Sequence, residues 1–322
     1  MGKGPSEGQR AASGNRKIAP TLLPSLPFAL HELQFQEMAL IGNISDTALL
    51  AAVYRARESE RADPLFRDPF ARRLAGDRGE DIARSLVFSE KNAWSWFTRT
   101  YVFDQLISKQ LASGCDLVVN LAAGLDARPY RMTLPPSLKW IEVDLPEITD
   151  YKEELLKDEQ PRCELERVRL DLADMAKRRE LFAKLAADAQ QVLIISEGLI
   201  VYLTAEEVGA LAKDLSQQAS FRHWLLDLAS PALLKMMQKK MGKPLEQAAA
   251  PLKFGPEEGP DFFKPYGWRV IDAHSMFHAA GRLKRLPLLF TFFYHLNKSE
   301  AFQAKRPWSG ACLLENVSST NG

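Results

Sequence analysis

The chain has 322 residues, of which 46% are apolar and 26% charged, and its formal net charge is +1. This length suits one large α/β domain or two small ones, and the composition allows a full-sized core. The near-zero charge, without a basic cluster that contains aromatic residues, argues against a nucleic-acid or membrane partner. The three cysteines, Cys115, Cys163 and Cys312, form no CxxC pair. They therefore argue against a disulfide framework or a structural zinc site, and they favour a cytoplasmic protein.

The N-terminal segment is polar and rich in Gly and Ser, and it lacks an apolar signal core. We expect residues 1–25 to be a flexible tail and residues 26–322 to form a single domain. The longest apolar run, Leu286–Leu296, is too short to span a bilayer.

Two helices are predicted before the sheet begins. Apolar residues recur at helical spacing over Ser45–Arg61, where Ser45 or Asp46 can cap the helix. Two Asp-Pro pairs then mark turns, and Gly76 is expected to end the segment. Asn92–Gly114 reads as a long amphipathic helix with Gly114 as its C-terminal cap.

Strands and helices alternate from residue 116 onward. The predicted strands cover 116–122, 138–146, 166–172, 190–198 and 220–230, and the predicted helices cover 146–159, 173–189 and 204–219. Thr204 and Glu207 have the spacing of a capping box. This order indicates a mostly parallel sheet with helices on both faces, and continuous apolar runs such as QVLIIS suit its central strands. Residues 230–264 are predicted to form a helical cover with a mobile loop, and residues 267–296 to supply one helix between the last two strands.

Polar residues gather where the predicted strands end. They are Gly124 and Asp126 after the first strand, Asp144 after the second, Asp171 after the third and Glu197 after the fourth. Ligands of an open α/β sheet bind at the carboxyl ends of its strands. A single acid there usually caps a helix, as we expect for Asp126 near Ala127, but acids at four successive strands fit a binding site better.

The type of cofactor follows from the first two strand ends. Asp144 lies 20 residues after Gly124, a spacing at which an acid typically binds ribose hydroxyls. A dinucleotide site would need G-x-G-x-x-G, whereas this chain has Ala122, Gly124 and Ala127, with Asp126 placed to repel a pyrophosphate. A nucleoside that carries an ammonium and a sulfonium tolerates such acids, and S-adenosyl-L-methionine is one.

Several blocks of sequence together resemble a known family. VVNLAAGLDARPYRM, WIEVDLPEITDYKEELL, RLDLAD and ISEGLIVYLTAEEV look like the leucine carboxyl methyltransferase family, and more closely like its bacterial S-adenosyl-L-methionine-dependent O-methyltransferases, some of them linked to polyketide pathways. The resemblance covers residues 45–295. It implies a Rossmann-like class I methyltransferase fold with a seven-stranded sheet.

The resemblance also implies roles for individual residues. Arg99 would pair with the carboxylate of the cofactor, Gly124 would lie under its methionine part, and Asp144 would hold the ribose. Asp171 and the backbone of Leu172 would contact the adenine. Glu197 would face the amino group or the transfer site, and Tyr202 would line the acceptor pocket; these two are the catalytic candidates. Ala122, also expected to bind the cofactor, stands where the family usually has glycine.

Each of these residues also has a simpler interpretation. Arg99 could be a surface charge of its helix, Asp144 and Asp171 could cap the helices that follow them, and Tyr202 could be a packing residue. Trp94 and Trp96 are expected to belong to the core rather than to a substrate platform.

The predicted function is methyl transfer to a carboxylate or hydroxyl oxygen of a small molecule or peptide, without a metal. A carboxylate acceptor is already ionised at neutral pH and needs no base, whereas a hydroxyl needs one. His274 and His278 lie four residues apart on a predicted helix and could serve as the base or bind a metal, although surface or packing histidines are favoured. The alternatives are an inactive S-adenosyl-L-methionine-binding protein and a nicotinamide-dependent oxidoreductase, which the missing glycine fingerprint disfavours. The acceptor and the oligomeric state stay open.

Overall fold

The computed structural model describes residues 1–2, 45–86, 90–247, 250–297 and 299–317. The chain divides into two units, 1–36 and 37–322, and every helix and strand below belongs to the second. Apart from its first two residues, the tail expected over 1–25 lies outside the described residues.

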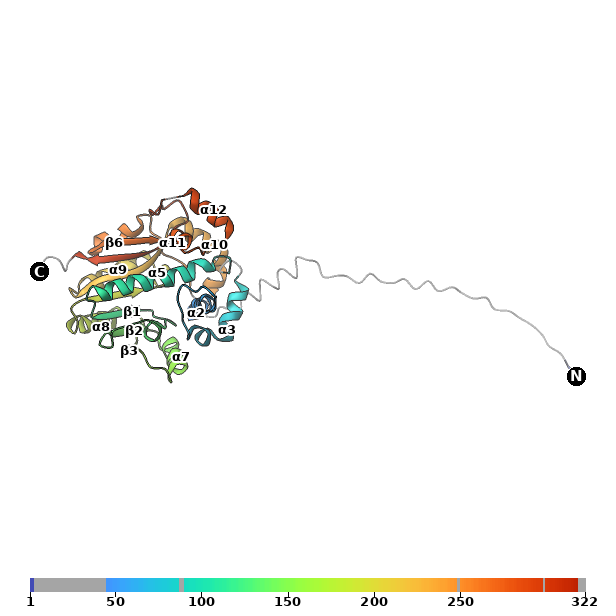
Figure 1. Cartoon of the computed structure of the whole chain (residues 1–322), viewed down its shortest axis with the longest axis horizontal. Helices are drawn as coiled ribbons and strands as arrows, with labels where there is room; N and C mark the ends of the chain where they lie inside the picture. Colours follow the sequence, from blue (N-terminus) through green and yellow to red (C-terminus); the bar gives the residue numbers. More distant parts are fainter. Residues whose placement is uncertain (3–44, 87–89, 248–249, 298, 318–322) are drawn as a thin grey trace. The chain divides into compact units, whose positions relative to one another are not determined.

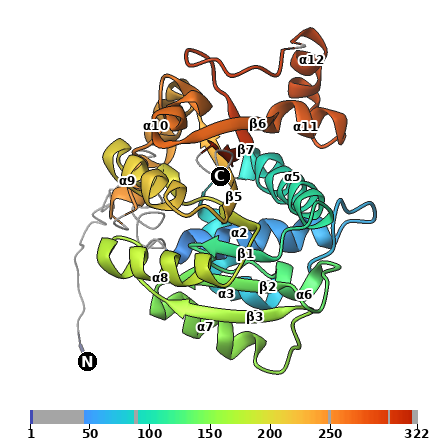
Figure 2. The same cartoon turned by 90° about the vertical axis from the view of Figure 1, so that its left-hand side faces the viewer.

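A seven-stranded sheet in the order β3-β2-β1-β4-β5-β7-β6 forms the centre of this unit (Figures 1 and 2). The strands are β1 Leu117–Leu121, β2 Lys139–Asp144, β3 Glu164–Arg169, β4 Val192–Ser196, β5 Phe221–Ala229, β6 Trp268–Ser275 and β7 Ser309–Asn316. The pairs from β3 to β5 are parallel, and β7 runs antiparallel to both β5 and β6. The predicted mostly parallel sheet is thus confirmed, and every residue of the central strands β1 and β4 is buried.

Helices cover both faces of the sheet. They are α2 Ser45–Ser59, α3 Ala71–Ser85, α5 Ala93–Ala112, α6 Arg128–Arg131, α7 Pro146–Leu156, α8 Met175–Ala187, α9 Ala205–Ser216, α10 Pro231–Gln247, α11 Met276–Arg282 and α12 Leu288–Leu296, with 3-10 turns at η1 Ile200–Tyr202 and η2 Gly259–Tyr266. Apolar side chains of α5 and α11 pack on one face, and those of α8, α9 and η2 pack on the other (Figure 2). The capping box of Thr204 and Glu207 is confirmed at the start of α9.

Two glycines were expected at the ends of helical segments. Gly76 has a non-helical conformation with φ 58°, so the first helical stretch of α3 ends there, and a second stretch follows across the kink. Gly114 follows the end of α5 with φ 96°, a left-handed conformation that glycine adopts at low cost, so its role as a helix stop is confirmed.

The prediction for the last part of the chain was wrong. The apolar run that was expected to be the final strand forms α12, and the final strand is β7, which lies beyond it. Residues 267–296 therefore hold one strand and two helices rather than two strands and one helix. A short, uniformly apolar run has no polar face to reveal its period, and periodicity alone cannot assign it. Within residues 230–264 the structure describes α10 and η2, which agree with the helical part of the predicted cover.

None of the helices within the described residues is long and apolar enough to cross a membrane.

Candidate active site

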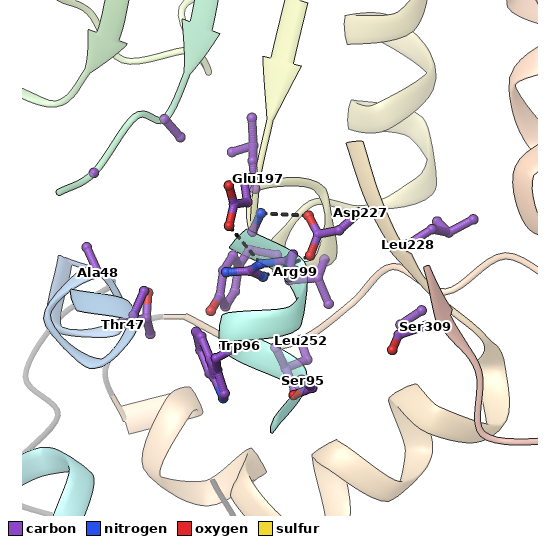
Figure 3. A pocket seen from close by; sticks show the side chains of 18 of the residues that line it. Thr47, Ala48, Ser95, Trp96, Arg99, Glu197, Asp227, Leu228, Leu252 and Ser309 are labelled. Atoms are coloured by element: carbon purple, nitrogen blue, oxygen red, sulfur yellow. Dashed lines mark hydrogen bonds and ion pairs between the residues drawn. The ribbon is translucent and has the colours of Figure 1, made fainter. Parts of the chain in front are cut away.

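A cavity of about 1410 Å³ opens at the carboxyl ends of β1, β2, β4 and β5. It is lined by all of the residues that the sequence singled out for the cofactor and for catalysis: Arg99, Ala122, Gly124, Asp144, Asp171, Leu172, Glu197 and Tyr202. Pockets for one ligand usually measure about 300–1,000 Å³, so this cavity has room for a cofactor and a second molecule. Figure 3 shows Glu197, Arg99 and Asp227 close together within it.

The turn after β1 is held in place by Asp144. Gly124 has φ 50°, and its backbone N–H donates to Asp144 Oδ2 at 2.5 Å. The other oxygen, Oδ1, accepts the N–H of Leu145 at 2.8 Å, so Asp144 does fix the start of α7 as the simpler interpretation had it. Burial raises the pKa of Asp144 despite these two hydrogen bonds. The carboxyl group still faces the cavity and retains lone pairs for a ligand.

Ala122 also adopts a left-handed conformation, with φ 52°. Residues other than glycine rarely do so, because the Cβ atom crowds the backbone. This geometry explains physically why a glycine is expected at this position.

Arg99 lies between two carboxylates in the cavity (Figure 3). Its Nε donates to Glu197 Oε1 at 3.0 Å and its Nη1 to Asp227 Oδ2 at 2.9 Å. Trp96 lies beneath the guanidinium, whose carbon is 5.2 Å from the ring centroid. Burial lowers the pKa of Arg99, but Asp227 and Glu197 outweigh burial and raise it. Arg99 is therefore a permanently charged group of the site and not a surface charge of its helix.

Both oxygens of Glu197 are engaged. Oε1 accepts from Arg99, and Oε2 lies 2.8 Å from Arg128 Nη1. Asp227 is fixed at the same time by Arg99 and by the backbone N–H of Gly198, which donates to Oδ1 at 2.7 Å. Paired in this way, the two carboxylates hold Arg99 in one orientation.

The acid and arginines after Gly124 join the turn after β1 to α5. Asp126 accepts the N–H of Arg128 at 2.9 Å, which agrees with its expected capping role, and its Oδ2 accepts from Asn120. Asp104 of α5 accepts from Arg128 Nε and from Arg131 Nη1, both at 2.7 Å. Burial alone would raise the pKa of Asp126, but Arg128 and its neighbours hold it well below the ordinary range. The helix that carries Arg99 is therefore fixed to the turn that carries Gly124.

The loop after β3 contributes Asp171 and Leu172. Asp171 Oδ1 accepts the N–H of Ala173 at 2.9 Å, whereas the cap of α8 is Asp174. Within the described part of the chain, Asp171 Oδ2 has no partner. The carbonyl of Leu172 accepts from Arg178 at 2.8 Å, which fixes the loop.

Tyr202 lies on η1 and is hydrogen-bonded to Thr47 of α2. Burial raises the pKa of its phenol, so Tyr202 stays protonated at neutral pH. Tyr202 packs against the hydrophobic core and also lines the cavity.

The two histidines do not form the expected pair. His274 lies on β6 and His278 on α11, because Ser275 caps a new helix between them. His274 contacts Asp272 at 3.0 Å, and His278 contacts Ser275 and the carbonyl of Asn297. Neither lines the large cavity; His278 is buried and His274 is partly exposed, which agrees with the favoured surface or packing role. Among the described residues, no cluster of His, Cys, Asp or Glu could hold a metal ion.

Sequence reasoning missed several parts of the site. Asp227 interrupts the apolar run WLLDLA of β5, and this isolated acid was a signal that could have been used. Trp94 and Trp96 pack against the core as expected, but both also line the cavity. Thr47 and Ala48 of α2 also line the cavity, and no local sequence pattern predicts this position for them.

Comparison with known proteins agrees with this geometry. The family model described as "Leucine carboxyl methyltransferase" matches residues 48–216. A Mycobacterium tuberculosis protein named "Putative S-adenosyl-L-methionine-dependent methyltransferase" is 31% identical over 257 residues, which cover 74% of this chain and 82% of the relative. A similarly named protein of Parafrankia sp. is 32% identical over 73% of this chain and 79% of its own length.

One solved structure of similar fold is described as a "putative methyltransferase" from Thermobifida fusca. It has a TM-score of 0.55 and 13% identity, and the match covers 88% of this chain and 97% of that one. At this identity the likeness concerns the fold alone. The matched family model and the level of identity to the curated relatives show that this chain belongs to the leucine carboxyl methyltransferase family.

Proposed function

We propose that this chain transfers a methyl group from S-adenosyl-L-methionine to a carboxylate or hydroxyl oxygen of a small molecule or peptide. The use of this methyl donor follows from membership of the family. Family membership does not establish the oxygen acceptor or the roles of single residues, and these are the parts that we propose. The observation that carries the proposal is the guanidinium of Arg99, held between Glu197 and Asp227 in the same cavity as Gly124 and Asp144.

The residues of the cavity suit this cofactor. A Cβ atom on Gly124 would lie 3.2 Å from the Cβ of Ala48, so the bare glycine backbone leaves room that a side chain would fill. Carboxylates at four strand ends offer acceptors to an ammonium, a ribose and an adenine amino group. The chain places an acid, Asp126, where a pyrophosphate would need N–H donors, and this supports a cofactor without phosphate.

We assign the cofactor contacts as follows. Arg99 Nη2, which has no partner within the described residues, would bind the carboxylate of the methionine part. Asp144 would accept from the ribose hydroxyls through its remaining lone pairs. Asp171 Oδ2 would accept from the adenine amino group.

The chain itself mainly has to orient the acceptor. When bound, S-adenosyl-L-methionine supplies an electrophilic methyl group on a good leaving group. The acceptor oxygen donates the electron pair of the new O–C bond, and the pair of the broken S–C bond remains on sulfur. Alignment of the acceptor in a closed cavity can therefore provide much of the rate.

The state of the cavity side chains supports a carboxylate acceptor over a hydroxyl. Glu197 and Asp227 are both engaged in ion pairs with arginine, and Tyr202 holds its proton. A carboxylate is ionised at neutral pH and needs no base. Tyr202 could donate a hydrogen bond to one oxygen of the acceptor carboxylate and so orient the other oxygen.

Calorimetry and a methyl-transfer assay test the proposal. We expect S-adenosylhomocysteine to bind, NAD not to bind, and Arg99→Lys to weaken S-adenosylhomocysteine about tenfold or more because Lys cannot reproduce the planar fork. Arg84→Lys, at an exposed ion pair with Asp81, is the matched control and should bind like the wild type.

Asp227→Asn should weaken binding about tenfold by releasing Arg99, since hydrogen bonds to charged groups contribute about 1.5–3 kcal/mol. Transfer of labelled methyl to nitrogen or carbon acceptors, with none to oxygen, would contradict the proposal.

A further inference from the structure

The helix α12 exposes an unusual amount of apolar surface. Its sequence is LLFTFFYHL, and it buries none of its residues. The exposed fractions of its outward side chains are 92% for Leu288, 66% for Leu289, 60% for Phe292, 49% for Phe293 and 67% for Leu296. Contiguous apolar patches of this kind mark binding grooves or interaction sites.

This surface continues into the large cavity. Phe290, Phe293 and Leu296 of α12 line its wall. Phe290 packs edge-on against Trp94 and Phe277, with ring centroids 6.3 and 6.5 Å apart, and so joins α12 to α5 and α11. One apolar strip therefore runs from the interior of the cavity to the exposed face of α12.

The wall opposite the cofactor turn is almost free of charge. α10 adds Leu233, Met236 and Met237, and Leu252 follows them. Among the described lining residues after Asp227, Arg306 alone is charged, and it is exposed. A charged or strongly polar acceptor would lose water here without gaining partners, whereas an apolar one would be stabilised by burial.

We infer that the acceptor is an amphiphile: a molecule with one carboxylate at the transfer site and a long apolar body that lies along α12. This rests on the proposed function and adds the class of its substrate. The size of the cavity supports the inference, because about 1410 Å³ exceeds what one ligand usually occupies. The continuity of the apolar strip supports it as well, because the strip leads outward in the direction that a long chain must follow.

A series of linear saturated carboxylic acids with 4 to 16 carbons tests this inference. Each acid is titrated by calorimetry into protein saturated with S-adenosylhomocysteine, and methyl ester formation is measured separately. We expect the dissociation constant to fall about tenfold for every two added methylene groups, until the strip is covered. A dissociation constant independent of chain length would overturn the inference, and so would equally tight binding of a charged peptide.

Variants of α12 locate the apolar body. Leu296→Asp and Phe293→Asp should flatten the dependence on chain length and leave the affinity for S-adenosylhomocysteine unchanged. Ile271→Asp, at an apolar residue of β6 that is 44% exposed and does not line the cavity, is the matched control and should keep the full dependence. If Leu296→Asp and Ile271→Asp behave alike, α12 does not bind the acceptor.

Other occupants of α12 give different results. If sedimentation equilibrium shows a dimer and Leu288→Asp dissociates it, the helix binds a second copy of the chain, and the inference is overturned. If the side chains of Leu288 and Phe292 resist carbene labelling in the ligand-free monomer, another segment of the chain covers α12. This result would also overturn the inference. Binding to phosphatidylcholine vesicles that Leu288→Asp abolishes, without binding of monomeric acids, would assign it to a lipid surface.

Failure of the inference and failure of the proposed function are distinguishable. If S-adenosylhomocysteine binds but no acid does, the acceptor class is wrong and the cofactor site stands. If S-adenosylhomocysteine does not bind, the proposed function itself fails.

Discussion

At the scale of single residues, the site combines conformational strain with charge. Ala122 holds a left-handed conformation in the turn that binds Asp144, and Asp144 keeps its carboxyl group in a desolvated position. Both features cost stability in the free protein, and both shape the surface offered to a cofactor.

Ala122→Gly should stabilise the protein. A left-handed residue other than glycine costs about 1–2 kcal/mol, and the greater freedom of glycine in the unfolded chain removes about 0.4–1 kcal/mol of this gain. The melting temperature should rise by about 2 °C, as calorimetry can measure. The matched control is Ala123→Gly, at a buried neighbour without positive φ, which should lower it. Equal shifts for the two variants would show that the conformation of Ala122 is not strained.

Acid should weaken cofactor binding through Asp144. Because burial raises its pKa above the ordinary value, Asp144 gains its proton at a higher pH than an exposed aspartate does. The protonated group is a poorer acceptor for ribose hydroxyls. The affinity for S-adenosylhomocysteine should therefore fall as the pH drops through this raised pKa and be constant above it. Asp144→Asn should bind more weakly at neutral pH and lose this acidic limb; a limb that persists would assign the titration to another group.

At the scale of elements, α5 and the turn after β1 behave as one framework. Arg128 and Arg131 are the first and last residues of α6, and both donate to Asp104 near the middle of α5, the helix that carries Arg99. Arg128 also lines the cavity and pairs with Glu197, so these arginines position the elements and side chains that surround the proposed ligand.

Asp104→Asn should disrupt this framework. The substitution leaves two buried guanidiniums without their shared carboxylate, and removal of one partner of a buried pair typically costs about 3–5 kcal/mol. Urea denaturation should show this loss. Asp81→Asn, at the exposed pair with Arg84, should stay within about 0.5 kcal/mol of the wild type. If both variants are equally stable, other partners hold the two arginines.

At the scale of the whole molecule, the sequence predicted the sheet well, and the residues that it singled out at the strand ends line one cavity. Continuous apolar strands, glycine at a turn and acids at strand ends are local signals, and they marked Gly124, Asp144 and Glu197. The wall to which we assign the acceptor could not be predicted in the same way. Its wall is built from α10, α11 and α12, and the uniform apolar run of α12 was taken for a strand. Asp227 was missed because its role depends on Arg99, which lies 128 residues away in sequence.

Cofactor binding should stabilise the unit 37–322 as one body. The cavity is lined by residues from Asp46 on α2 to Gly310 on β7, so a bound ligand contacts elements from both ends of this unit. S-adenosylhomocysteine at 100 times its dissociation constant should add about 2.7 kcal/mol to the free energy of unfolding. At that level the melting temperature should rise by about 5–10 °C within a single transition. NAD at the same concentration is the control and should produce no shift. A second transition that S-adenosylhomocysteine leaves in place would show that α2 and α3 unfold independently of the sheet and do not close the cofactor site.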